Sequence, residues 1–221
     1  MKTVVIKLGG SLITPDKIDI EFVKEFRDLI KGYLDKFKFI IICGGGRTAR
    51  KYRDALNYLG VEDFKDLDLM GIAATRINAE LMKFSFQKLS HNKVIHDFTS
   101  KVKFDKVLFA CGWKEGHSTD YDAVMFAKQY GADKVIVLSN VPHIFTADPA
   151  IVEDAKPIKS TTVGEYLEIV GEKWTPGRNV IVDPSAAKSL DKGMELIVIN
   201  TLDKLNSVLS GKKFEGSTLS A

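Results

Sequence analysis

The sequence has few of the features that mark several common classes of protein. Only two of its 221 residues are cysteine, too few for a disulfide framework or a cysteine-based metal site. No apolar run approaches the roughly 18 residues needed to span a bilayer. The net charge is only +3, and no basic tract of five or more residues occurs. Membrane-spanning and nucleic-acid-binding functions are therefore not favoured.

Two common nucleotide-binding patterns and a targeting signal are also missing. Neither GxxxxGK[ST] nor GxGxxG occurs in the chain, which argues against a P-loop kinase and a dinucleotide-binding Rossmann enzyme. The N-terminal MKTVVIKLGG has no signal-peptide apolar region or cleavage site, and we expect it to form a first strand. We expect a cytoplasmic protein.

The remaining composition is that of an ordinary globular protein, with 45% hydrophobic and 28% charged residues. Short apolar segments alternate with segments in which apolar residues recur every three or four positions, which predicts strands alternating with helices. We expect a single three-layer α/β/α domain over residues 1–221 with a mostly parallel central sheet. The expected strands are Val4–Leu8, Phe39–Ile42, Lys106–Ala110, Lys134–Leu138 and Leu196–Asn200.

Helices are expected between these strands, and Asp19 is expected to cap the first. The polar segment after Gly211 is expected to add an edge strand or to fray, and Cys43 and Cys111 are expected to be buried at strand ends. The helix that begins near Phe64 is expected to turn Met70, Ala73, Ala74, Ile77, Leu81 and Phe84 inward. The expected helices end near Lys36, Leu59, Leu89, Tyr130, Val170, Lys192 and Leu209.

Two glycine-rich segments follow the first two predicted strands. Lys7 precedes Gly9-Gly10-Ser11, where backbone N–H groups can turn toward an anion and the ammonium can neutralise phosphoryl oxygens. Gly44-Gly45-Gly46 precedes a helix whose N-terminus favours an anion, and Arg50 lies in its first turn. The alternatives are plain glycine turns with a solvated lysine. We favour phosphate binding for the second loop.

A third polar segment runs from Gly112 to Pro149. A loop with Ser118, Thr119 and Asp120 leads through a helix and a buried strand to an Asp-Pro pair. Polar groups at the carboxyl ends of buried strands are where α/β proteins bind small ligands. Asp68, on an otherwise apolar helix, would suit two ribose hydroxyls or would simply be a surface carboxylate. The three segments together predict phosphoryl transfer.

These residues carry a family resemblance. KLGGS, GGGRTARKY, DLMGIAATRINAELM, GHSTD, SNVPHIFTADP and VIVDPSAAK occur in the order and spacing of the amino acid kinase superfamily. The chain most resembles its uridylate kinase branch, in the archaeal style, over nearly all of residues 2–200. The resemblance implies transfer of the γ-phosphoryl group of ATP to UMP, with the acceptor bound mainly by residues 1–120 and the donor by residues 121–221.

The resemblance also implies roles for the acceptor residues. Gly44, Gly45 and Arg50 would hold the acceptor phosphate, and Asp68 would bind its ribose. A loop after the third strand would line the uracil and phosphate pocket, with its last residue hydrogen-bonding the base. The residues of this loop are Trp113, Lys114, Glu115, Gly116, His117, Ser118 and Thr119.

The implied donor site includes the transferring phosphoryl group. Asp120 and Asp183 would orient Lys7 and the assembly of Mg²⁺ and phosphate, with the metal held through phosphates and by no direct protein ligand. The helix around Ile72–Phe86 has more apolar surface than one face needs, which suits a large core or an interface between copies. The resemblance implies a homo-oligomer built from dimers, a hexamer. The residues expected to contact ATP are Lys7, Gly9, Gly10, Ser11, Gly45, Arg50, Ser139, Asn140, Phe145, Asp148 and Lys188.

Three departures from the family pattern bear on these roles. Pro142-His143 stands where the family has Asp-Gly, which changes the turn beside the donor site. His143 would be a pH-sensitive ATP contact or, as we favour, a surface turn residue. Cys111-Gly112 replaces a common Gly-Gly, and Trp113 would stack on a base or cover the core.

Other functions stay open from the sequence alone. A kinase of this family with an isoprenyl phosphate, carbamate or carboxylate acceptor would need neither Arg50 nor Asp68. A non-catalytic nucleotide-binding or storage protein would have no need of Lys7, Asp120 and Asp183.

Overall fold

The computed structural model describes residues 1–147, 151–171 and 181–221. Within these residues the chain forms a seven-stranded sheet, in the order β3-β2-β1-β4-β8-β9-β7, and a two-stranded ribbon of β5 and β6. The strands are β1 (Lys2–Leu8), β2 (Phe37–Cys43), β3 (Val107–Ala110), β4 (Lys134–Leu138), β5 (Ile144–Phe145), β6 (Pro157–Ile158), β7 (Ser160–Thr162), β8 (Glu195–Ile199) and β9 (Ser217–Ser220).

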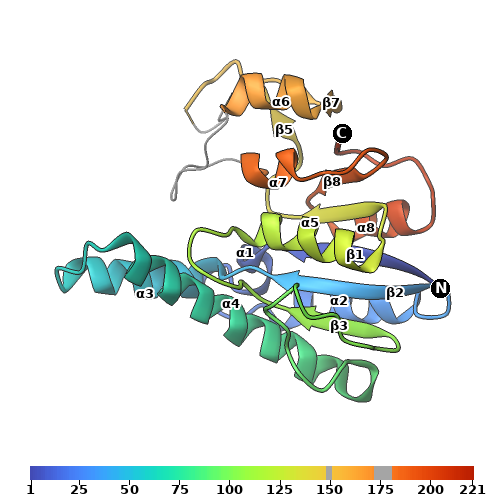
Figure 1. Ribbon diagram of the computed structural model, residues 1–221, viewed down its shortest axis with the longest axis horizontal. Coiled ribbons are helices and arrows are strands. Elements are labelled where there is room, and N and C mark those ends of the chain that lie inside the picture. Colours follow the sequence, from blue (N-terminus) through green and yellow to red (C-terminus); the bar gives the residue numbers. More distant parts are fainter. Residues whose placement is uncertain (148–150, 172–180) are drawn as a thin grey trace.

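Helices cover both faces of the large sheet (Figure 1). They are α1 (Gly10–Ile13), α2 (Ile20–Lys31), α3 (Gly46–Tyr58), α4 (Phe64–Phe86), α5 (Thr119–Tyr130), α6 (Val163–Val170), α7 (Pro184–Lys188) and α8 (Leu202–Leu209), with a 3-10 turn, η1 (Gln87–Leu89). The predicted three-layer α/β fold is confirmed. Among the described residues, no helix is both long and apolar enough to cross a membrane.

Local sequence signals account for most of these boundaries. The side chain of Asp19 accepts a hydrogen bond from the backbone of Phe22, which confirms it as the cap of α2. That helix ends at Lys31 rather than near Lys36, because Gly32 follows it and the next residues form turns. Helix α7 is likewise shorter than predicted and ends at Lys188.

The central strands run parallel, and their order creates a switch point beside β1. Strands β2 and β3 lie on one side of β1, and β4 and β8 lie on the other. The carboxyl ends of these strands therefore meet at one edge of the sheet, where such folds bind ligands. Both glycine loops, the loop after β3 and Ser139 follow strands that end at this edge.

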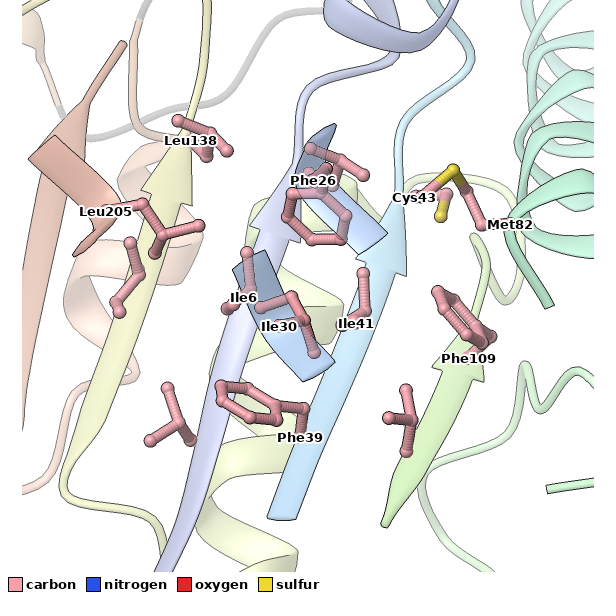
Figure 2. Packing of buried hydrophobic residues seen from close by; sticks show 14 of the residues in the cluster. Ile6, Phe26, Ile30, Phe39, Ile41, Cys43, Met82, Phe109, Leu138 and Leu205 are labelled. Carbon is pink, nitrogen blue, oxygen red and sulfur yellow. The ribbon is translucent and has the colours of Figure 1, made fainter. Parts of the chain in front are cut away.

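Alternate side chains of each central strand point to opposite faces, as the period of a strand requires. Figure 2 shows one core, in which Phe26 and Ile30 of α2 cover Ile6 and Ile41 of the sheet. Helices α4 and α8 extend this layer. Helices α5, α6 and α7 pack on the opposite face. Cys43 and Cys111 are buried free thiols, as predicted.

The inward face predicted for α4 is largely wrong. Of the six residues expected to face inward, only Ala74 is buried, while Ala73, Ile77 and Phe84 are exposed. The buried positions include the polar residues Thr75 and Asn78. Polar side chains are buried when they have partners, and apolar periodicity does not reveal those partners.

The C-terminal segment does form a strand, but the prediction of an edge strand or a frayed end is wrong. Strand β9 lies between two others, antiparallel to β8 and parallel to β7. Ser217 is fully buried, accepts the backbone N–H of Ile144 at 2.8 Å and donates to the carbonyl of Ile158. The segment therefore ties the two-stranded ribbon to the main sheet.

This arrangement predicts that Leu219→Ala lowers the free energy of unfolding by about 2–5 kcal/mol, because Leu219 is fully buried in the second core. Thr218→Ala, at a half-buried neighbouring position, is the control and should cost less. Urea unfolding measures both. A loss below about 0.5 kcal/mol for Leu219→Ala would mean that β9 does not belong to the folded sheet.

Candidate active site

The two glycine loops are in direct backbone contact. A Cβ atom on Gly10 would lie 2.1 Å from the backbone nitrogen of Gly46 and 2.4 Å from the carbonyl oxygen of Gly44. Gly46 has φ of +59°, and its own Cβ would lie 2.2 Å from the carbonyl oxygen of Gly10. We predicted that glycines stand here because they let an anion approach the backbone N–H groups. The structure adds a steric reason, since side chains here would force the loops apart.

The side chain of Asn78 on α4 holds the second glycine loop through two hydrogen bonds. Its amide donates to the carbonyl of Gly44 at 2.7 Å and to that of Gly45 at 3.2 Å. Its oxygen accepts the Thr14 hydroxyl, at the end of α1, at 3.3 Å. One buried side chain thus links the second glycine loop to the end of α1. Sequence reasoning missed it, and an asparagine within an apolar helix was the available signal.

The structure brings Arg50 to the first glycine loop. Arg50 is exposed on α3, and its Nη2 lies 3.4 Å from the Ser11 hydroxyl. Gly45 is the residue that precedes α3 and makes no side-chain cap. In the first turn of α3, the N–H of Arg47 already donates to the carbonyl of Thr14 at 3.0 Å. The exposed guanidinium of Arg50, beside Ser11 and near the N-terminus of this helix, is suited to a phosphate.

Lys7, Asp120 and Asp183 lie near the edge of the sheet at which the glycine loops follow their strands. Nζ of Lys7, near the end of β1, is 3.0 Å from Oδ1 of Asp120 in the first turn of α5. Asp183 accepts the hydroxyl of Ser118 and, at 2.7 Å, the backbone N–H of Ser185. Burial raises the pKa of Asp183, against these two hydrogen bonds. All three predicted catalytic residues thus lie on elements that meet at this edge.

The loop of residues 113–119 and the residue before it, Gly112, are each hydrogen-bonded to α4. Asp68 accepts the backbone N–H of Gly116 at 2.8 Å. The hydroxyl of Thr75 accepts that of Gly112 at 2.9 Å. Thr75 was not predicted. Asp68 is more than a free surface carboxylate, because one of its oxygens holds the predicted acceptor loop.

The aromatic ring of Trp113 covers the core. It lies edge to face with Phe98, with ring centroids 4.6 Å apart, and is half-buried. Nζ of Lys114 sits 4.3 Å above the same ring. The adjacent Glu115 pairs with Lys65 at 3.3 Å. Of the two alternatives for Trp113, the structure therefore favours packing on the core.

The predicted donor residues follow β4 and its neighbours. Ser139 is fixed by a hydrogen bond from its N–H to the carbonyl of Ile199 at 2.9 Å, and its hydroxyl accepts the backbone of Val141 at 3.4 Å. Asn140 is exposed, and Phe145 pairs with Pro157 in the ribbon. Asp148 lies outside the described residues. Lys188 ends α7, one helical turn beyond the cap residue Asp183.

His143 is not a surface residue, so that prediction is wrong. Only 8% of its surface is exposed, and its Nε2 lies 3.8 Å from Oε1 of Glu215. The next residue, Ile144, is held by Ser217. The C-terminal segment therefore contacts the chain at and directly after the Pro142-His143 turn.

Thiol chemistry does not fit this site. Burial raises the pKa of the Cys111 thiol to about 11 and raises that of Cys43 further. A thiol with such a pKa carries almost no thiolate near neutral pH, and the thiolate is the reactive form. The site is therefore built from backbone N–H groups, cations and carboxylates.

Three comparisons with known proteins support the resemblance found in the sequence. Residues 2–200 match the amino acid kinase family. A protein named uridylate kinase from Pyrococcus abyssi is 31% identical, over 98% of both chains, and one from Methanococcus aeolicus is 33% identical, over 94% of this chain and 97% of its own.

Solved structures show the same fold. The crystal structure of uridylate kinase from Archaeoglobus fulgidus has a TM-score of 0.83 and 30% sequence identity, with all of both chains covered. Aspartate kinase from Synechocystis has a TM-score of 0.70 at 19% identity, and this chain covers 40% of that one. The second likeness supports the fold alone.

The contact between the loops predicts that Gly10→Ala lowers the free energy of unfolding by about 1–3 kcal/mol, because the added methyl group meets backbone atoms. Gly71→Ala is the matched control, since it lies in α4 with no other atom closer than 4.0 Å. In a helix interior that change should stabilise by up to about 1 kcal/mol. Equal effects in urea unfolding would contradict the tight contact.

Proposed function

This chain belongs to the amino acid kinase family, and we propose that it transfers the γ-phosphoryl group of ATP to UMP, giving ADP and UDP. The observation that carries the proposal is that the two glycine loops lie in direct contact at the strand ends, where Lys7 pairs with Asp120. One loop with Arg50 can hold the acceptor phosphate while the other faces the donor. The names of the relatives support the choice of UMP.

The acceptor would be bound by groups on α3, α4 and the loop of residues 113–119. Arg50 and the N–H groups of the Gly45 loop would hold its phosphate. Asp68 has one carboxylate oxygen beyond the one bound to Gly116, and this oxygen is available to a ribose hydroxyl. Thr119 begins α5 beside Ser118 and would contact the base. A phosphate and a ribose in one acceptor account for Arg50 and Asp68 together.

The transfer itself would need positioning and charge neutralisation. An oxygen of the UMP phosphate forms the new bond to the γ-phosphorus, and the bond from that phosphorus to the bridging oxygen of ADP breaks. The acceptor oxygen is already ionised, so no protein base is required. Lys7, held by Asp120, would neutralise the charge on the phosphoryl oxygens. Asp183, by accepting from Ser118, would keep the start of α5 in place.

Mg²⁺ would enter with ATP and would neutralise part of the negative charge on its phosphates. The described residues contain no cluster of three His, Cys, Asp or Glu side chains suited to a metal. Asp120 is paired with Lys7, and Asp183 accepts two hydrogen bonds. We propose that the metal would be held through the phosphates of ATP, which Lys7 and the glycine loops would hold in turn.

The donor nucleoside would lie beyond β4, in the second half of the chain. Ser139, Asn140 and Phe145 lie on the segment that leaves this strand and leads into the ribbon. Lys188 would reach the donor phosphates from α7. Residues 1–120 would thus mainly bind the acceptor and residues 121–221 the donor, in the cytoplasm, where both nucleotides occur.

The direct experiment is a coupled assay of ADP release with Mg²⁺-ATP. UMP, CMP, AMP, carbamate, isoprenyl phosphate and amino acids serve as acceptors. We expect UMP to give the highest kcat/KM. Turnover with another acceptor but none with UMP would contradict the proposal, and turnover with none would point to a nucleotide-binding protein without catalysis.

Two variants separate acceptor binding from transfer. Arg50→Ala should raise the KM for UMP by one to two orders of magnitude, the loss of a charge-assisted interaction of about 1.5–3 kcal/mol. Lys7→Ala should mainly lower kcat, by about 10²–10³-fold. Lys51→Ala is the matched control, because this cation on the same helix pairs with Asp16. An unchanged kcat in Lys7→Ala would refute its role.

We also propose that two copies pair through α4, as the base of a larger homo-oligomer, a hexamer. Ile77 is 59% exposed and Phe84 is 69% exposed on this helix, one and three turns beyond the buried Ala74. Ile77→Asp should convert the assembly to monomers in sedimentation equilibrium. Ile20→Asp, at a 71% exposed position on α2, should not. A wild-type protein that is monomeric at micromolar concentration would contradict the pairing.

A further inference from the structure

Asp122 is a buried carboxyl group that the phosphoryl transfer described above does not use. It lies on α5, two residues after Asp120, and none of its surface is exposed. Its Oδ2 accepts the backbone N–H of Trp113 at 3.2 Å. A carboxyl group this deeply buried needs partners for both oxygens.

The partner for the second oxygen is the ring of His117. Oδ1 of Asp122 and Nδ1 of His117 are both buried and have no hydrogen bond to any other described group. They face each other at 3.5 Å. A single proton between these two atoms would give each of them a hydrogen bond. No other described group gives either atom a hydrogen-bond partner. Asp122 therefore contacts the loop of residues 113–119 at both its beginning and its far side.

We propose that Asp122 is a positioning residue for the acceptor loop, and that its carboxyl group, sharing one proton with His117, holds that loop against α5 without adding a negative charge. The inference rests on the proposed function, because the loop is assigned to the acceptor UMP. Asp122 itself does not touch the substrate.

Burial first, and then the surrounding carboxylates, keep the proton on Asp122. Asp120 on the same helix, Asp183 at α7 and Asp68 on α4 all disfavour a further carboxylate. Burial, together with these carboxylates, raises the pKa of Asp122 to about 8, against the Trp113 hydrogen bond. The buried thiol of Cys111 lies near enough to be influenced by Asp122 and is not ionised near neutral pH.

His117 is driven toward its neutral form as well. Burial and the nearby Lys114 lower its pKa, against the attraction of Asp183 and Asp68. A neutral imidazole has an acceptor nitrogen for the Asp122 hydroxyl. The pair is then uncharged at neutral pH. Above pH 8 the carboxyl group ionises, and a fourth negative charge would oppose a dianionic acceptor.

The ring of His117 also packs against three aromatic side chains, one of which, Trp113, belongs to the same loop. It lies edge to face with Trp113, with centroids 5.4 Å apart, and with Tyr121, at 4.7 Å. It stacks on Phe98 at 6.2 Å. Loss of the Asp122 partner would therefore release the ring that these three side chains surround.

The test compares three variants by steady-state kinetics with UMP between pH 6 and 9.5. Asp122→Asn can accept from Trp113 and donate to His117, so its KM for UMP at pH 7 should stay within about threefold of wild type. Asp122→Ala leaves both partners unsatisfied, and its KM should rise about tenfold or more, with a smaller change in kcat. Asp203→Asn, the same change at an exposed position on α8, is the control.

The pH profile separates positioning from a merely structural role. In the wild type, the KM for UMP should rise above pH 8, because the neutral carboxyl group is lost as pH rises through its folded-state pKa. Asp122→Asn should show no such rise. An unchanged alkaline rise in Asp122→Asn, or an unchanged KM in Asp122→Ala, would overturn the proposal.

A readout without substrate distinguishes this inference from the proposed function. Carboxyl ¹³C NMR of the whole protein should show Asp122 titrating near pH 8, with the backbone amide of Trp113 shifting in the same step. This decides the inference even if Asp122→Ala fails to fold or the wild type does not phosphorylate UMP. Titration near pH 4, the ordinary value, would refute the shared proton.

Discussion

The site depends on one contact, the backbone of the first glycine loop lying against the backbone of the second. Gly10 and Gly46 approach so closely that neither position has room for a Cβ atom. The contact brings together the ends of β1 and β2, which are neighbours in the sheet. Lys7 at one strand end and Arg50 beyond the other are thereby held at the same edge, and the buried amide of Asn78 keeps the second loop in place.

Charge is the second constraint on this edge of the sheet. Asp68, Asp120 and Asp183 all lie close enough to Asp122 to disfavour its ionised form. A site for two anionic nucleotides cannot leave all four as free carboxylates. Asp120 is paired with a lysine, Asp68 and Asp183 accept hydrogen bonds, and Asp122 is buried against a histidine. The arrangement leaves Lys7 and Arg50 as cations at the proposed point of transfer.

The fold could be predicted from sequence because its five central strands are apolar and a glycine loop directly follows each of the first two. The failures share a physical cause. On α4, Asn78 and Thr75 are buried because each bonds to a loop distant in sequence, while Ile77 and Phe84 are exposed. His143 and β9 likewise owe their places to long-range partners. Asp122 stands between Tyr121 and Ala123 with nothing in its spacing to mark His117 as a partner. Local patterns do not contain such pairings.

The most direct measurement is a crystal structure with UMP and a non-transferable ATP analogue bound together. The account predicts the UMP phosphate beside Arg50 and the first turn of α3, with the terminal donor phosphate in line with it and within hydrogen-bond distance of Nζ of Lys7. Phosphates bound away from the paired glycine loops, or a Lys7 amine that contacts neither nucleotide, would contradict it.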